Sequence, residues 1–149
     1  MPSVQLSLKG RALRLLSGRE HSRSELERKL ERFEEEPGTL ARALDELQAK
    51  GFIDEQRVIE SVLHSRAAKL GATRIKHELQ GKGLDPQAIG EALAGLKTSE
   101  HERALTVWRK KFGKPPLNAL ETARQIRFLA SRGFGAEVIR QVIKASTST

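Results

Sequence analysis

The stretch LQGKGLDPQAIGEAL, residues 79–93, indicates a repeated fold, because LASRGFGAEVIRQVI, residues 129–143, has the same apolar skeleton at an offset of 50. In the first copy Leu79 lies on an apolar helix face, and Gly83 ends that helix in the left-handed conformation that glycine tolerates. Asp85 then caps a second helix, with proline at its first position. The second copy carries a glycine at the matching position. The pattern predicts the same helix–turn–helix twice.

A third copy of the skeleton lies near the start of the chain. Its helix begins with a capping box between Ser22 and Glu25. Leu30 and Leu40 are separated by ten positions, as are the matching apolar residues of the other two copies. The helix-ending glycine is absent, and Pro37 with its following glycine makes the turn instead.

Another amphipathic helix precedes each copy. The three leading helices are expected in residues 8–18, 54–71 and 99–113. The second should begin at Asp54 as N-cap and end at Gly71. The third should begin with a capping box between Ser99 and Glu102. In the last copy, Ile126 is expected on the apolar stripe that leads to the glycine stop.

These helices predict an all-α fold of three tandem three-helix, helix-turn-helix-like repeats. The expected repeats cover residues 1–53, 54–97 and 98–149. One such unit buries its apolar stripes poorly by itself, and stacking copies is the usual remedy. We therefore expect nine helices in an elongated, curved array; the alternative is a compact nine-helix bundle.

The composition suits a helical protein with a modest core and without disulfides or thiol chemistry. Hydrophobic residues make up 38% and charged residues 31%, and cysteine is absent. No apolar run reaches the ~20 residues of a membrane span, so a cytoplasmic protein is expected. The net charge of +8 is uneven: residues 1–97 hold 17 Lys+Arg against 15 Asp+Glu, whereas residues 98–149 hold 10 against 4. A basic face of this kind suits phosphate or an acidic protein surface. The alternative is a solvated surface that keeps the protein soluble, and composition alone does not separate the two.

Two longer segments resemble the RecX family of bacterial recombination regulators. These are ALRLLSGREHSRSELERKL, residues 12–30, and ALDELQAKGFIDEQRVIESVLHSRAAKLGATRIKHELQGKGLD, residues 43–85. RFLASRGF, residues 127–134, also fits, so the resemblance covers about residues 8–145. Val58 and Ile59 stand where the family favours an aromatic residue, and Ala72 where proline is common, which affects packing and helix entry.

The resemblance implies tandem three-helix repeats and a function. It implies binding to RecA, the recombinase that forms filaments on single-stranded DNA, and inhibition of its recombinase, ATPase and co-protease activities. Recombination and the SOS response would thereby be modulated. We also expect a monomer with no cofactor and with weak direct binding to DNA.

Reactive groups do not converge in the sequence. The four histidines form no pair at the i, i+3 or i, i+4 spacing of helical metal ligands. The GKG at residues 81–83 lacks the spacing and the Ser/Thr of a phosphate-binding loop. We therefore expect neither an enzyme nor a metal site.

Basic residues of the second and third repeats are the candidate contact surface for RecA or DNA. The candidates are Arg66, Lys69, Arg74, Lys76, Arg109, Lys110, Lys111, Lys114, Arg127 and Arg132. Trp108 either stacks on a base or packs in the core, and its position four residues before Phe112 on one helix face favours the core.

A basic helix-turn-helix protein that acts on DNA directly is the competing function. The helix nearest to a recognition pattern carries Arg124, Gln125 and Arg127. A scaffold unrelated to nucleic acid would leave the basic C-terminal third without a role.

Overall fold

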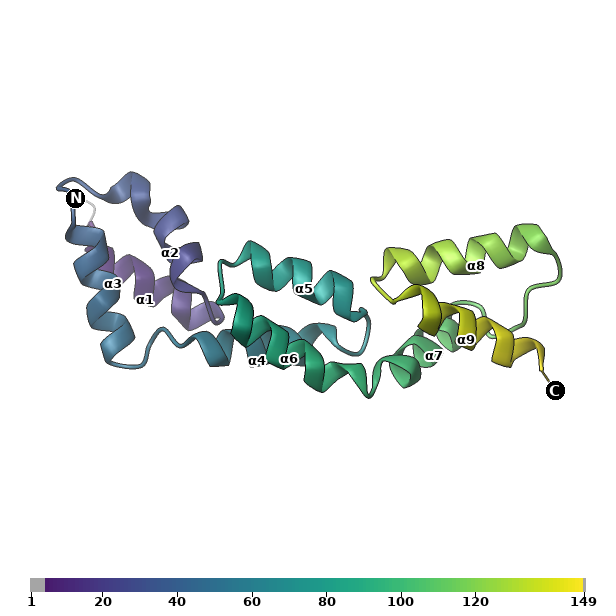
Figure 1. Cartoon of the computed structure of the whole chain (residues 1–149). Coiled ribbons are helices and arrows are strands. Elements are labelled where there is room, and N and C mark those ends of the chain that lie inside the picture. The colour runs from purple at the N-terminus through teal and green to yellow at the C-terminus, as the bar shows by residue number, and fades with distance from the viewer. Residues whose placement is uncertain (1–4, 149) are drawn as a thin grey trace.

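The chain, described here by a computed structural model over residues 5–148, is all-helical and elongated (Figure 1). Within these residues it has nine α-helices and one 3-10 helix, η1. The helices are α1 Leu8–Gly18, α2 Arg23–Leu30, η1 Glu31–Phe33, α3 Thr39–Ala49, α4 Glu55–Arg66, α5 Ala72–Gly81, α6 Pro86–Lys97, α7 Glu100–Lys111, α8 Ala119–Ser131 and α9 Ala136–Thr147. They form three successive three-helix units, as the sequence predicted. Between residues 5 and 148, none of the helices has the length and apolar character that a membrane span requires.

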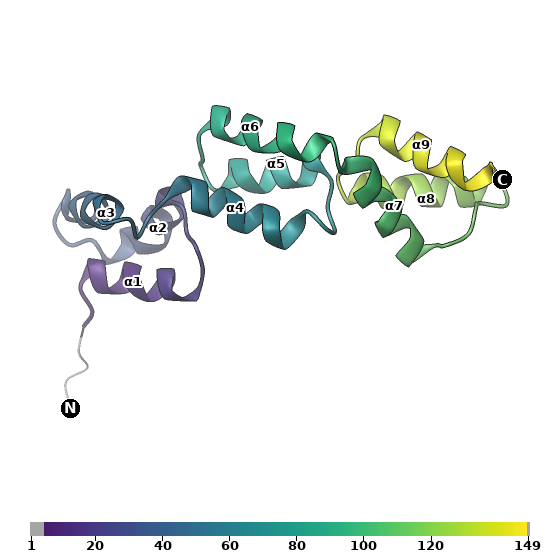
Figure 2. The ribbon, with the colours of Figure 1, turned by 90° about the horizontal axis from the view of Figure 1, so that it is seen from below.

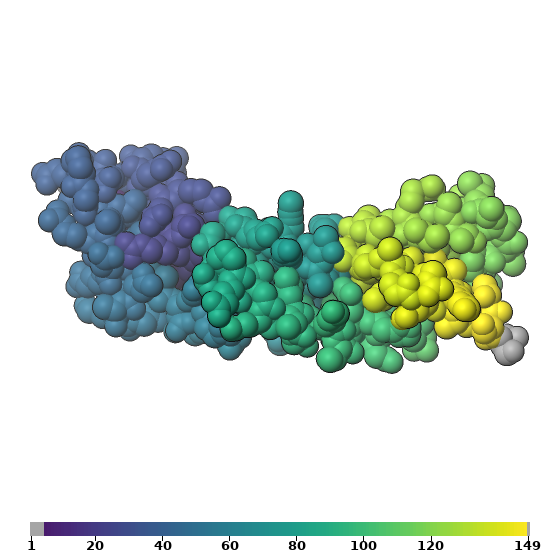
Figure 3. Space-filling model, viewed as in Figure 1, coloured from purple at the N-terminus to yellow at the C-terminus, as the bar shows by residue number. Residues whose placement is uncertain are grey.

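Each unit has its own hydrophobic core. The first core is built on Ala12, Leu26, Leu30, Leu40, Leu44, Leu47 and Ile53. The second is built on Val58, Ile59, Val62, Ile75, Leu79, Leu84 and Ile89. The third is built on Ala104, Trp108, Leu129, Phe134, Ile139, Val142 and Ile143. Three separate cores rule out the compact bundle, and the space-filling view shows a long, curved molecule (Figure 3). The repeat boundaries at 53/54 and 97/98 stay predictions.

The repeated skeleton folds as its spacing predicts. Leu79 and Leu129 are both fully buried, at 0% exposure. Gly83 and Gly133 both have positive φ, 69° and 89°, so a left-handed glycine follows the end of α5 and of α8. The Asp85 carboxylate accepts a hydrogen bond from the backbone N–H of the third helical residue at 3.1 Å, as an N-cap does.

Two predicted helix ends are wrong. Helix α4 ends at Arg66, and Gly71 instead precedes α5 with a φ of −82°. The predicted capping box at Ser99 is absent, because the Ser99 hydroxyl donates to the Leu96 carbonyl at 3.1 Å. Gly71 serves a contact with the third repeat, which local sequence does not reveal, whereas the Ser99 hydroxyl bonds back to the preceding turn instead of capping α7.

The apolar stripe of α8 also differs from the prediction. Ile126 is 42% exposed, whereas Gln125 is only 5% exposed. The Gln125 side chain accepts a hydrogen bond from the Trp108 indole N–H at 2.9 Å and donates to the Lys114 carbonyl at 3.1 Å. A buried indole N–H needs an acceptor, and the glutamine supplies it.

Successive repeats meet through one kind of joint that occurs twice. In Figure 1 the middle helices α8, α5 and α2 follow one another along one side of the array. At the joint between the second and third repeats, the N–H of Gly71 donates to the Arg132 carbonyl at 2.8 Å and that of Thr73 to the Gly133 carbonyl at 3.2 Å. The C-terminal turn of α8 therefore caps the start of α5.

The joint between the first and second repeats uses side chains for the same contact. The Ser22 hydroxyl donates to the Lys82 carbonyl at 2.6 Å, and the Arg28 guanidinium donates to the Gly81 carbonyl at 2.9 Å. Lys82 also forms an ion pair with Glu25 at 3.2 Å. The C-terminal turn of α5 thus packs on the start of α2, and Figure 2 shows the three units in a row.

Candidate interaction surface

All ten candidate cations have exposed side chains. They come from the end of α4, the loop that follows it, α5, the last turn of α7, the loop after α7, and α8 with its C-cap. Each of them is accessible to a partner, but only some of them lie close together.

Two candidates meet at one aromatic ring in the third repeat. The Lys111 ammonium lies 5.3 Å from the centroid of the Phe128 ring, and the Arg132 guanidinium lies 4.9 Å from it. The edge-on contact with Phe112, at a centroid distance of 5.4 Å, holds the ring in place. The quadrupole of the ring attracts both cations, so α7 and α8 present them together.

Arg74 lies on the other side of the adjacent joint. Its guanidinium donates to the Ser131 carbonyl at 2.6 Å, next in the chain to Arg132. The structure therefore groups three candidates across the boundary between two repeats. We call Arg74, Lys111 and Arg132 the joint cluster.

Lys114 joins Lys111 around a separate hollow of the third repeat. The hollow also takes in Arg124, with Phe112 and other apolar side chains on its wall. Glu121 supplies the carboxylate of this hollow. That carboxylate accepts a hydrogen bond from the backbone N–H of Leu117 at 2.7 Å, which offsets part of its negative charge. The hollow therefore remains predominantly basic.

Other candidates are dispersed. Arg66 forms an ion pair with Glu78 at 3.0 Å, which offsets its charge. Arg74 and Lys76 are two residues apart on α5 and so point about 200° apart around the helix. The ten candidates therefore do not form one continuous patch.

Two residues considered for DNA contacts, one aromatic and one with an amide side chain, are buried. Trp108 is 7% exposed, so it does not offer a stacking face, and packing in the core is confirmed. Gln125 is its buried partner, which removes it from the expected recognition pattern of α8.

The sequence reasoning missed one structurally important cation, Arg103. Its guanidinium donates to the Ala67 carbonyl at 2.9 Å and the Leu70 carbonyl at 2.7 Å, and its Nη2 reaches the Leu96 carbonyl at 3.3 Å. Burial lowers the pKa of Arg103 against the opposing effect of Glu100. Part of the positive charge of the third repeat thus holds repeats together. Its position just before the buried Ala104 was the only sequence signal.

The joint between the first and second repeats also contains a perturbed carboxylate. Burial of Glu25 opposes its ionisation, but hydrogen bonds from Arg19, the Ser22 N–H and Lys82 outweigh this and lower the pKa of Glu25 to about 2. The ionised carboxylate therefore completes the capping box of α2 and binds the neighbouring repeat at once.

Comparison with known proteins gives a consistent result along the chain. Three family models match: RecX, first three-helix domain, at residues 9–47; RecX, second three-helix domain, at residues 54–93; and RecX, third three-helix domain, at residues 99–143. The regulatory protein RecX of Leptothrix cholodnii is 51% identical over 140 residues, which cover 94% of this chain and 89% of that protein.

More distant relatives agree. The regulatory protein RecX of Ralstonia nicotianae is 42% identical over 146 residues, 98% of this chain and 92% of that protein. The crystal structure of RecX from Lactobacillus salivarius aligns with a TM-score of 0.76 at 20% identity and covers 93% of each chain. At that identity the structural match bears on the fold alone.

Proposed function

Because this chain belongs to the RecX family of regulatory proteins, we propose that it is a non-enzymatic regulator that binds RecA and RecA filaments on single-stranded DNA. Binding would inhibit the recombinase, ATPase and co-protease activities of RecA and so modulate recombination and the SOS response. The relatives that match are named regulatory proteins, which supports a role without catalysis.

The observation that carries the proposal is the row of three cores joined by hydrogen-bonded joints. A long surface of this kind can contact successive subunits of a filament at once, and linked contacts raise the overall affinity. Inhibition would then be physical, through bridging of subunits and obstruction of filament extension. No reactive group of this chain is needed for it.

For the contact surface we propose the basic groups around the third repeat and its joint. The joint cluster supplies cations from two repeats, and Lys110 and Lys114 extend the charge along the last turn of α7 and beyond. These exposed cations suit acidic protein or DNA phosphate on the filament. The remaining candidates Arg66, Lys69, Lys76, Arg109 and Arg127 would make peripheral contacts.

We place the protein in the cytoplasm with RecA. The head-to-tail joint supports action as a monomer. Each joint uses the glycine turn after a middle helix. In the first repeat α2 continues directly into η1 instead. This end therefore lacks the turn that would dock on α8 of a second copy.

The test is the single-strand-dependent ATP hydrolysis of RecA, with this protein titrated in while DNA stays in excess. We expect strong inhibition well below one molecule per RecA, because so little protein cannot cover the DNA. Inhibition only when the protein suffices to cover the DNA would favour the competing proposal, a helix-turn-helix protein that acts on DNA directly.

A charge-reversal variant tests the contact surface. Replacing Lys110, Lys111 and Lys114 by glutamate should weaken filament binding about tenfold or more. The matched control reverses three exposed cations elsewhere, Arg42, Lys97 and Lys144, with the same change in net charge. Equal binding by both variants, with the helical circular dichroism intact, would contradict the proposed surface.

A further inference from the structure

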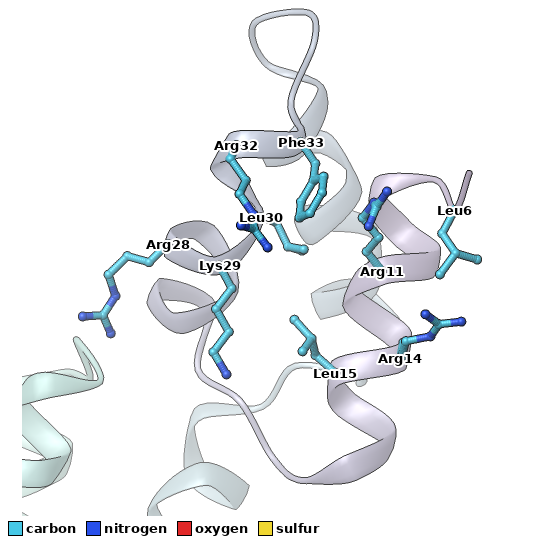
Figure 4. Close-up of a pocket in the computed structure, with 9 residues that line it drawn as sticks. All are labelled: Leu6, Arg11, Arg14, Leu15, Arg28, Lys29, Leu30, Arg32 and Phe33. Atoms are coloured by element: carbon cyan, nitrogen blue, oxygen red, sulfur yellow. The ribbon is translucent and has the colours of Figure 1, made fainter. Parts of the chain in front are cut away.

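A second basic feature lies in the first repeat, outside the proposed contact surface. Between α1, α2 and η1 is a hollow of about 620 Å³, within the range of roughly 300–1,000 Å³ that binding pockets occupy. Its lining consists of Leu6, Arg11, Arg14, Leu15, Arg28, Lys29, Leu30, Arg32 and Phe33. Figure 4 shows these side chains, and we call this hollow the basic groove.

The floor of the basic groove is apolar and its rim is cationic. Leu15, Leu30 and Phe33 lie between the facing helices, with the side chains of Arg11, Lys29 and Arg32 near them (Figure 4). The Arg28 guanidinium points away and donates to the Gly81 carbonyl of the second repeat. None of the nine lining residues is acidic. Among the described residues no carboxylate forms an ion pair with any of its five cations.

The composition of the first repeat does not reveal the positive charge of the basic groove. Residues 1–53 contain ten Lys+Arg and nine Asp+Glu, which nearly cancel. The fold separates them: Glu35 and Glu36 line the adjoining hollow, which shares Arg11 and Arg32 with the groove. The groove is therefore a local cationic site that ends where these two carboxylates begin.

The one aromatic ring of the basic groove already has partners. The Arg11 guanidinium lies 3.8 Å from the centroid of the Phe33 ring, and the Arg32 guanidinium lies 4.7 Å from it. Figure 4 draws them on either side of the ring. Nucleobases bind single-strand sites by stacking on free aromatic faces, and here those faces are covered. The aliphatic floor likewise offers nothing specific to a phosphodiester chain.

An acidic peptide with an aliphatic side chain satisfies both parts of the groove. The aliphatic group would fill the floor at Leu15 and Leu30, and flanking carboxylates would meet the guanidinium groups of the rim, which bind carboxylates in bidentate geometry. We propose that the basic groove docks such an acidic segment of a partner protein. This site is independent of the cations of the second and third repeats.

The experiment measures fluorescence anisotropy of three labelled probes with the full chain. The first probe alternates glutamate with leucine, the second has the same glutamates with glycine in place of leucine, and the third is a single-stranded oligonucleotide of equal charge. We expect the glutamate–leucine peptide to bind about tenfold more tightly than either of the other probes. Equal binding of all three, or tighter binding of the oligonucleotide that depends on the groove, would overturn the proposal.

Two variants test the rim and the floor separately. Arg14→Glu with Arg32→Glu should weaken binding of the glutamate–leucine peptide about tenfold. The control, Arg42→Glu with Lys97→Glu, should change that binding less than about twofold. Leu15→Gln leaves the net charge unchanged and should abolish the preference for leucine over glycine. Circular dichroism shows that each variant is folded.

A separate measurement tests whether a second copy of this chain occupies the basic groove. Light scattering of the unmodified protein should show a monomer at the concentrations used. An oligomer that Arg14→Glu with Arg32→Glu dissociates would assign the groove to self-association and refute peptide docking.

Discussion

Replacing Gly71 with alanine should open the joint between the second and third repeats without unfolding either repeat. A Cβ at this position would lie 2.4 Å from the Gly133 carbonyl oxygen and 2.6 Å from the backbone nitrogen of Phe134. These are backbone atoms of a helix end, so they cannot turn aside as a side chain would. The φ of Gly71, −82°, suits alanine, so the effect comes from the contact between repeats.

The magnitude follows from the contacts that would separate. Two backbone hydrogen bonds cross the joint, from Gly71 and Thr73, and the Arg74 guanidinium adds a third. A net contribution of about 1 kcal/mol for each of the two neutral bonds, and roughly 1.5–3 kcal/mol for the charged one, gives a loss of roughly 3–5 kcal/mol. Stability in repeat arrays is a sum of repeat and interface terms, so the loss should appear in the unfolding transition while helicity at neutral pH is retained.

The assay combines urea unfolding with a distance measurement. Because the chain contains no cysteine, cysteines at exposed positions Gln87 of α6 and Gln141 of α9 can be labelled specifically with a fluorescent pair. Gly71→Ala should lower the urea midpoint and broaden the distance distribution. The matched control is Gly90→Ala on α6, where a Cβ meets nothing within 4 Å and should stabilise the helix by about 0.5–1 kcal/mol.

One outcome would refute this reasoning. If Gly71→Ala kept the distance distribution of the unmodified chain and lost less than about 0.5 kcal/mol, which is the range of neutral surface substitutions, the close approach of the two glycines would not determine the joint. Weakened RecA inhibition by Gly71→Ala, with both repeats folded, would in contrast link the rigid array to the proposed function.

Three further predictions concern buried or partly buried polar groups. Arg103→Met should cost about 2–4 kcal/mol in urea unfolding, because three backbone carbonyls lose their charged donor; an unchanged midpoint would contradict this. Folding lowers the pKa of Glu25 from 4.5 to about 2, so its contribution, on the order of 3 kcal/mol, is present above the unfolded pKa and is lost as pH falls toward 2. The difference in unfolding free energy between Glu25→Gln and the unmodified chain should shrink over that interval, and a constant difference would refute the assignment. Gln125→Met should cost about 1–3 kcal/mol by leaving the Trp108 N–H without an acceptor, which tryptophan fluorescence during unfolding measures; a loss below about 0.5 kcal/mol would count against it.

The fold was largely predictable because its signals are local. Apolar spacing along Leu79 and Ile89 gives a helix face, and Gly83 and Gly133 give the turns, since only nearby residues decide both. The position of Trp108 in the core follows from the same spacing. Where the prediction failed at Gly71, the residue contacts another repeat, and at Ser99 the hydroxyl bonds back to the Leu96 carbonyl in place of the expected cap.

The candidate surface was less predictable. The sequence identified cations, but it did not distinguish Arg103, which donates to carbonyls between repeats, from Lys111, which is displayed on the Phe128 ring. It also took Gln125 for an exposed residue because glutamine usually is one. Charge and polarity are properties of the residue, whereas exposure depends on what packs against it.

Local patterns in the sequence specify the helices, their grouping in threes and the family, because periodicity, capping residues and glycine turns act over a few neighbouring positions. Tertiary structure alone decided how the repeats dock and where the charges gather. The contact between Ser22 and Lys82 joins residues 60 positions apart, and the basic groove combines cations of a repeat whose charges nearly cancel. Such features depend on the relative placement of helices, which no local pattern encodes.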